Sequence, residues 1–346
     1  MAAQQGIQFL DWAGRRVAFD VRGDGPFLVA PAWWVSHLEA DASDPRYTRF
    51  WRDLSDGFTL VRYDRLGVGL SDREVGQADV SLDAEIDCLQ ALLDRLAVDR
   101  ATLMGGSSGG CTAIAFAARH PERVERLVLY GAYARGVDVA PADVRAAVLA
   151  AVRSHWGLGS RLLAQIFLGD DAQEGQERFA RLQRESADAE TAARLLEFVY
   201  GVDVSADLLH VEAPAVVVHK RSDRAVPYEL GRRLAATLPN ATFVPLAAGS
   251  AHLPWYEDPD AVVRACRGGL GEPTRVGAAD GEPDLLSERE RQVLALVARG
   301  LTDREIAEQL VISPHTVHRH VANVRHKLGS TSRSAAVAEA VRLELL

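Results

Sequence analysis

The stretch L-M-G-G-S-S-G-G at residues 103–110 limits what this 346-residue chain can fold into more than any other feature. It contains the pattern G-x-S-x-G with Ser107 at its centre, between a β-compatible apolar run and a helix-forming run. This order is typical of a nucleophile elbow, a sharp strand-to-helix turn that lifts a serine side chain clear of a sheet. Glycines flank the serine because a Cβ there would clash with backbone packed against the turn. The pattern makes Ser107 a candidate nucleophile.

The residues around the turn favour a sheet, although glycines and serines alone would equally suit a flexible loop. Residues 98–104 predict a buried strand, residues 111–119 an apolar helix, and residues 124–130 the next strand. Strand, helix and strand in this order form the βαβ unit of a parallel sheet. The predicted fold class is therefore α/β.

Similar signals extend over residues 1–267. We expect strands at 7–11, 16–21, 27–30, 58–63, 215–219 and 242–246, and helices at 44–56, 81–96, 229–238 and 258–267. Between about 136 and 207 helical periodicity replaces the strand signals, which predicts an inserted helical cap over the active edge of the sheet. Five glycines and two prolines in the seventeen residues from 268 to 284 indicate a linker, which we place at 268–283.

Two polar residues further along the chain complete a candidate catalytic set with Ser107. Asp223 lies in the turn after a late strand, and His252 lies in a loop after the next strand. The order serine, acid, histidine is the one that an elbow serine requires. The imidazole takes the hydroxyl proton, and a buried carboxylate fixes the imidazole tautomer. Each residue also has a structural alternative: Ser107 in a tight turn, Asp223 as a helix cap and His252 as an ordinary loop histidine. The occurrence of all three in the order of a triad favours catalysis.

Residues 7–267 resemble the α/β-hydrolase family. The run D-R-L-G-V-G-L-S at 64–71 is similar to the family's D-x-x-G-x-G-x-S turn. Ser107 and the two polar residues above lie where the family has its triad. The resemblance implies an α/β-hydrolase fold with a helical cap.

The resemblance also implies an oxyanion hole formed by the backbone N–H groups of Ser108 and Trp33. The loop of the second donor reads A-P-A-W-W at 30–34, where the family often has His-Gly, so two indoles crowd it. Loss of one donor typically slows a reaction about 10²–10³-fold, so whether this chain is an enzyme stays open. Trp33, Trp34 and Trp255 are candidate walls of a ligand pocket, although aromatic side chains more often belong to a core.

The last 63 residues predict a separate helical module. Two capping boxes, S-E-R-E at 287–290 and T-D-R-E at 302–305, predict helix starts at Glu288 and Asp303. Proline after serine predicts a third start at Pro314, and a fourth helix is expected near Arg333. The second helix should end at Leu310, so that residues 311–313 form a short turn. This is the layout of a helix-turn-helix domain, which we place at 284–346.

This segment closely resembles the LuxR-type DNA-binding domain. The runs L-S-E-R-E-R-Q-V-L at 286–294, G-L-T-D-R-E-I-A at 300–307 and S-P-H-T-V-H-R-H-V at 313–321 match its signature. The third helix carries a basic patch, which makes it the natural recognition helix. By this resemblance the candidate DNA-binding residues are His315, Thr316, His318, Arg319, Arg325 and Lys327.

Charge and composition support a local contact with DNA. The formal net charge is −9, yet residues 284–346 hold nine lysines and arginines against eight acids. An acidic body with one basic patch favours a local polyanion contact. The sequence shows no signal-peptide pattern and no apolar run of about 18 residues, and its three cysteines are scattered. These features predict a cytoplasmic protein without membrane contact. No residue pattern calls for a metal or a cofactor.

Together these features predict a LuxR-type transcriptional regulator that binds double-stranded DNA as a homodimer. Its hydrolase-like body would sense a small acyl, ester or lactone ligand and control DNA binding. One alternative is a working serine hydrolase, an esterase or lactonase, that also binds DNA. Another is a constitutive DNA-binding protein whose body is a dimerisation scaffold, but a scaffold needs no Ser-Asp-His set.

Overall fold

The computed structural model describes residues 6–169, 173–247, 249–271, 288–310, 314–328, 330 and 332–342. The chain divides into two compact units, Met1–Val276 and Gly277–Leu346. Each unit is described by itself.

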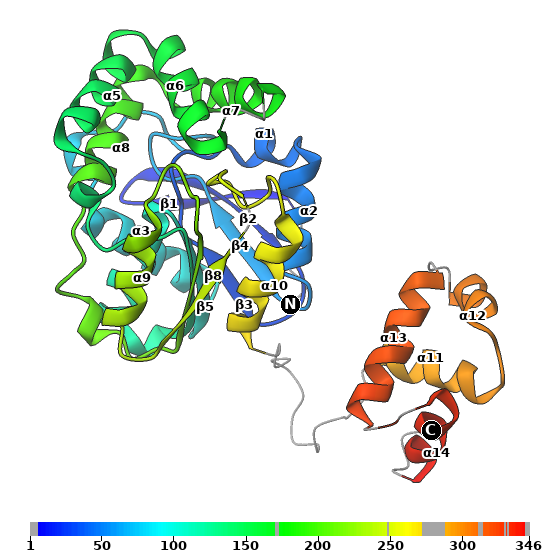
Figure 1. Cartoon of the computed structure of the whole chain (residues 1–346). Helices are drawn as coiled ribbons and strands as arrows, with labels where there is room; N and C mark the ends of the chain where they lie inside the picture. Colours follow the sequence, from blue (N-terminus) through cyan, green and yellow to red (C-terminus); the bar gives the residue numbers. More distant parts are fainter. Residues whose placement is uncertain are drawn as a thin grey trace. The chain divides into compact units, whose positions relative to one another are not determined.

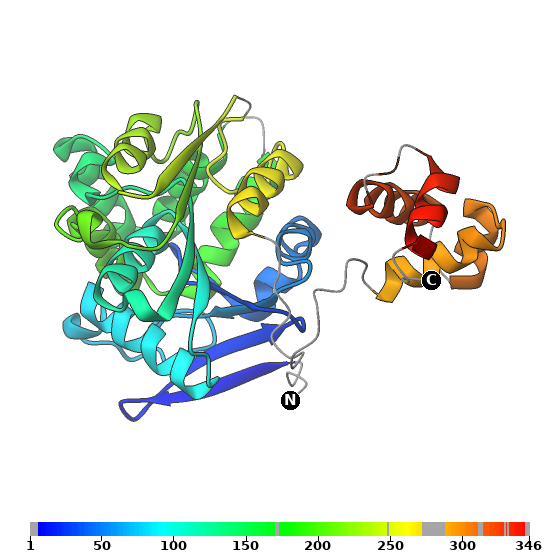
Figure 2. The same ribbon diagram turned by 90° about the horizontal axis from the view of Figure 1, so that it is seen from below.

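A mixed sheet of eight strands forms the centre of the described part of the first unit (Figure 1). Its order is β1-β2-β4-β3-β5-β6-β7-β8. The strands are β1 Ile7–Trp12, β2 Arg15–Arg22, β3 Phe27–Ala30, β4 Thr59–Tyr63, β5 Ala101–Gly106, β6 Val124–Tyr130, β7 Ala215–Lys220 and β8 Ala241–Leu246. The antiparallel hairpin β1–β2 lies at one edge (Figure 2), and β3 to β8 run parallel. The predicted α/β class is confirmed, and the loops after the parallel strands gather at one edge of the sheet.

Helices cover both faces of the sheet, because its strands are apolar on both sides. Val29, Leu103 and Leu127 pack into one cluster, and Leu28, Met104 and Val128, next to them in sequence, pack into the other. The first layer contains α3 (Leu82–Arg95), α4 (Ser108–Arg119) and α9 (Tyr228–Thr237). The second contains α2 (Pro45–Leu54) and α10 (Pro259–Leu270), which contact each other; the short α1 (Leu38–Ala42) precedes α2.

Four further helices lie above the sheet in Figure 1 and fall within the range predicted for the cap. They are α5 Ala142–Ser154, α6 Trp156–Leu168, α7 Gln173–Ser186 and α8 Ala189–Gly201. A buried polar chain ties these helices to the loop after β3. The indole N–H of Trp34 donates to Gln183 Oε1 at 2.9 Å, and the Gln183 amide donates to the Ser160 carbonyl at 2.9 Å.

The largest differences from the predicted boundaries are at β5, which begins at Ala101 and not at residue 98, and at the end of α10. Helix α4 begins at Ser108, directly after the elbow serine, and includes the predicted helical run 111–119. Helix α10 continues to Leu270, three residues into the predicted linker, since Leu270 is buried and Gly269 packs closely against Val216. The remaining linker residues 272–283 and the predicted turn 311–313 lie outside the described residues.

The described part of the second unit consists of four helices around one apolar cluster. They are α11 Glu288–Ala298, α12 Asp303–Leu310, α13 Pro314–Lys327 and α14 Arg333–Arg342. All four predicted starts are confirmed. At α12 the Thr302 N–H and hydroxyl each donate to Glu305 Oε2 at 2.7 Å, which is the predicted capping box. Arg333 joins α14 to α12 through the Asp303 carboxylate at 2.5 Å.

Candidate functional site

The elbow holds Ser107 in a strained backbone conformation. Its φ of 51° and ψ of −128° are unusual for a residue with a side chain, and such strain concentrates at functional sites. The Ser107 N–H donates to the Tyr130 carbonyl at 2.9 Å, which fixes the turn to β6. A Cβ at Gly106 would lie 2.2 Å from the Trp33 ring, and one at Gly109 would lie 2.8 Å from a backbone oxygen. Glycine is therefore required on both sides of the serine.

Asp223 and His252 come together although 28 residues separate them in the chain. His252 Nδ1 lies 2.7 Å from Asp223 Oδ2, and both side chains are buried. The other carboxylate oxygen accepts the N–H groups of Ala225 at 2.9 Å and Val226 at 3.0 Å. Burial raises the pKa of the Asp223 carboxyl, but the adjacent His252 and these N–H donors hold it below its usual value. An ionised carboxylate thus faces the imidazole and fixes its tautomer.

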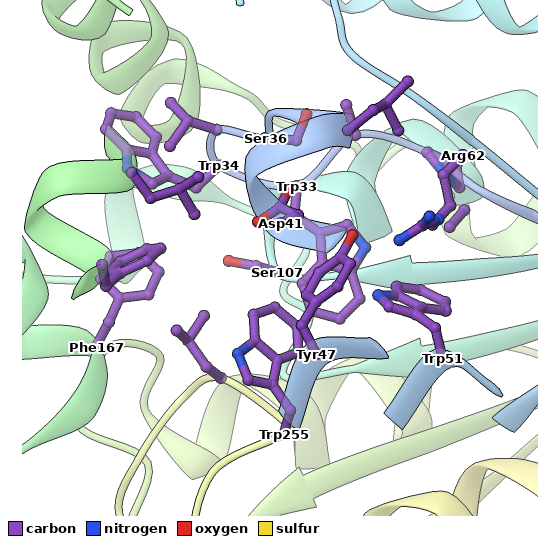
Figure 3. A pocket seen from close by; sticks show the side chains of 18 of the residues that line it. Trp33, Trp34, Ser36, Asp41, Tyr47, Trp51, Arg62, Ser107, Phe167 and Trp255 are labelled. Carbon is purple, nitrogen blue, oxygen red and sulfur yellow. The ribbon is translucent and has the colours of Figure 1, made fainter. Parts of the chain in front are cut away.

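The second hydrogen bond of the predicted triad, between Ser107 and His252, is not formed in this structure. Both side chains line one cavity (Figure 3), in which Ser107 is labelled. Nε2 of His252 is buried and has no hydrogen-bond partner among the described residues. Such catalytic hydrogen bonds are often long before a ligand is bound.

A buried lysine and a glutamate position the loop that carries His252. Lys220 Nζ donates to the Ala251 carbonyl at 2.8 Å, and Glu257 Oε2 accepts the Ala251 N–H at 3.1 Å. The ammonium and the carboxylate lie 3.6 Å apart. Burial lowers the pKa of Lys220, and Glu257 opposes that shift. Neither residue was predicted from sequence, although Lys220, a charged residue at the end of the apolar run V-V-V-H-K, could have indicated a functional position.

The two predicted oxyanion donors are brought together by a side chain of the elbow. The Ser108 hydroxyl donates to the Trp33 carbonyl at 2.7 Å, and the same oxygen accepts from Arg65 Nη2 at 2.6 Å. Within the described residues, neither the Ser108 N–H nor the Trp33 N–H donates to a protein acceptor. Two such N–H groups next to the candidate nucleophile Ser107 have the geometry of an oxyanion hole.

The cavity is narrow, and eight of its twenty lining residues are tryptophan, tyrosine or phenylalanine. Its empty space is about 660 Å3 including the open mouth, while the part that the centre of a water molecule can reach is about 60 Å3. Trp33, Trp34 and Trp255, the three predicted wall residues, all line it. Other lining residues were not predicted from sequence, because separate elements bring them together; those from α1, α2 and β4 are Asp41, Tyr47, Trp51 and Arg62.

All six predicted DNA-binding residues lie on α13, whose buried Val317 and Val324 face the core of the second unit. The structure describes the side chains of only two of the six. His318 is largely exposed and its Nδ1 lies 3.6 Å from the Asp303 carboxylate, and Arg325 is partly buried. The side chains of the other four lie outside the described residues.

The described residues hold no group of three or more His, Cys, Asp or Glu side chains that could bind a metal ion. They also include no helix that is both long and apolar enough to cross a membrane. The three cysteines are buried free thiols.

The strand order, the elbow and the paired carboxylate and imidazole define the first unit as an α/β hydrolase, and the second unit is a helix-turn-helix domain. The chain belongs to the α/β-hydrolase fold family, whose model matches residues 39–259. Residues 284–340 match the model for bacterial regulatory proteins of the luxR family. Both predicted resemblances are confirmed, and the second unit is a LuxR-type DNA-binding domain.

The similar proteins match the first unit. A 2-hydroxy-6-oxononadienedioate/2-hydroxy-6-oxononatrienedioate hydrolase from Paraburkholderia phymatum is 31% identical over 67% of this chain and 79% of its own. The crystal structure of an enol-lactonase from Burkholderia xenovorans has a TM-score of 0.64 at 25% identity, covering 77% of this chain and 100% of that one. A hydrolase from Pseudomonas aeruginosa has a TM-score of 0.65 at 26% identity, covering 77% and 98%.

Proposed function

We propose that this protein is a LuxR-type transcriptional regulator whose hydrolase domain binds a small acyl, ester or lactone compound and thereby controls DNA binding. The observation that supports this most directly is the presence of both units in one chain. A ligand shifts DNA affinity only if it binds one conformation of the chain better than another. Binding as a homodimer to double-stranded DNA belongs to the same proposal.

Hydrolysis of the ligand is the second candidate function. The pairing of Asp223 with His252 at 2.7 Å favours it, as does the name of the relative from Paraburkholderia phymatum. Ring-opening of a lactone would then remove the signal that the domain binds, or produce it.

The residues support a two-step acyl transfer. His252 Nε2 takes the hydroxyl proton while Ser107 Oγ attacks the carbonyl carbon. The N–H groups of Ser108 and Trp33 stabilise the oxyanion. Collapse of this intermediate breaks the ester bond, and the leaving alkoxide receives the proton from His252. Water then attacks the acyl-serine, its proton passes to His252, and the acid leaves as Ser107 regains its hydroxyl proton.

The test uses a fluorophosphonate, which reacts only with an activated serine. We expect the intact mass of the full chain to rise by one adduct, and Ser107→Ala and His252→Ala to stay unlabelled. A duplex selected by the full chain from a random DNA pool then reports DNA affinity. We expect the labelled protein to bind this duplex differently from the unlabelled protein.

The two functions separate in this experiment. Labelling without any change in DNA affinity would leave hydrolysis of the ligand as a candidate function and overturn the proposed control of DNA binding by the ligand. A folded wild type that stays unlabelled would overturn hydrolysis. In that case the regulator would still be supported if acyl compounds changed DNA affinity.

A further inference from the structure

Asp41 is a buried acid that lines two neighbouring cavities. It lies in α1, and only 6% of its surface is exposed. It lines the inner cavity with Ser107 and His252, and also an outer pocket bounded by α2 and the cap helix α7. The two cavities share six lining residues: Asp41, Tyr47, Phe179, Leu182, Leu253 and Trp255. A ligand that reached Ser107 through the outer pocket would therefore pass the Asp41 carboxylate.

Asp41 forms no ion pair within 4 Å in the described part of the chain, although the positive charge of Arg62 partly offsets the burial of its carboxyl and lowers its pKa. The carboxylate accepts one hydrogen bond, from the His37 N–H at 3.0 Å. Arg62 lines the same cavity but pairs with Asp20, at 2.7 and 3.2 Å. Burial of the carboxyl raises its pKa to about 7. A neutral asparagine would accept the same backbone N–H without this cost, so the local structure does not explain an acid here.

The surroundings of Asp41 fit a cation. Figure 3 shows Asp41 among the labelled side chains of Trp33, Trp34 and Tyr47. Tyr47 contacts Trp255 edge-on with ring centroids 4.8 Å apart. Aromatic walls together with a carboxylate are a typical environment for an ammonium group, which gains from the ring electrons and from the acid.

We propose that Asp41 binds a positively charged amine at the far end of the ligand whose carbonyl lies at Ser107. The ligand of this domain is thus an acyl compound with a protonated amino group on its acyl chain. This assignment rests on the proposed acyl-binding function and specifies the ligand further.

Three methyl esters of equal chain length test the assignment: methyl 6-aminohexanoate, methyl 6-hydroxyhexanoate and methyl heptanoate. Their binding is followed at pH 8 by tryptophan fluorescence of the full chain carrying Ser107→Ala, which prevents turnover. All six tryptophans lie in residues 1–267, and four of them line the inner cavity. We expect the amino ester to bind about tenfold tighter than the heptanoate, the typical gain from one charge-assisted hydrogen bond.

Added Asp41→Asn should abolish the preference for the amino ester over the heptanoate. Asp44→Asn is the matched control, because Asp44 lines only the outer pocket and caps α2 through its bond to the Arg46 N–H. This variant should retain the preference. Unchanged near-ultraviolet circular dichroism shows that each variant is folded.

Several results would overturn the assignment. These are equal affinity for all three esters, tighter binding of the hydroxy ester than of the amino ester, or an amino preference that survives Asp41→Asn. Loss of the preference in Asp44→Asn as well would assign it to the combined negative charge of the two neighbouring buried acids and not to Asp41. If a folded protein bound none of the three esters, the acyl-binding function itself would fail with the assignment. If the protein bound methyl heptanoate but did not prefer the amino ester, only the assignment of Asp41 as the amine-binding residue would fail.

Discussion

Asp41→Asn should stabilise the hydrolase unit, and the gain should grow with pH. The folded state raises the pKa of this carboxyl from 3.8 to about 7. Between these values the unfolded chain releases the proton while the folded chain keeps it, so stability falls as pH rises. At 1.36 kcal/mol for each pKa unit, the loss reaches about 4 kcal/mol above pH 7, of which about 1.4 kcal/mol falls between pH 6 and pH 8.

Urea unfolding of the full chain measures this effect. Tryptophan fluorescence follows only the first unit, because no tryptophan lies beyond residue 255. Other buried acids such as Asp64 and Glu85 also have raised pKa values, so the difference between variant and wild type is the relevant quantity. Asparagine can still accept the His37 N–H bond. A difference that is constant from pH 6 to pH 8, or a variant less stable than wild type at pH 8, would refute the reasoning.

Three further outcomes are expected. Glu257→Gln should slow fluorophosphonate labelling of Ser107 by about tenfold or more, because Ala251 and Lys220 lose the carboxylate that positions the His252 loop. The time course of the intact mass measures this rate, and an unchanged rate would contradict the prediction. Trp34→Phe should destabilise the first unit by about 1–3 kcal/mol in urea, since Gln183 Oε1 loses its donor, whereas a shift below about 0.5 kcal/mol would show that the bond is dispensable. Arg319→Ala should weaken DNA binding and reduce by about one the slope of log affinity against log salt concentration, measured by anisotropy of a labelled duplex. The control Arg304→Ala, at an exposed position on α12, should change neither quantity. Equal effects of the two variants would remove Arg319 from the DNA interface.

The helix starts of the second unit could be predicted from sequence because each depends on local chemistry. The hydroxyl of Thr302 and the carboxylate of Glu305 are three residues apart, so their bonds need no tertiary contact. The strands and the order of Ser107, Asp223 and His252 were equally readable. Apolar runs and turn residues are local signals, and the hydrolase fold has one chain order for these three side chains.

Only the tertiary structure determined the contents of the cavity and the support of the histidine loop. Asp41, Arg62 and Tyr47 belong to different elements, and each is an ordinary residue in its own segment. Lys220 contacts Glu257 across 36 intervening residues, and Trp34 reaches Gln183 on the cap across 148. Local sequence fixed which segments become strands, helices and turns, because those depend on neighbours in the chain. Burial and pairing of charges depend on residues that only folding brings together, and these decide which ligand the site can hold.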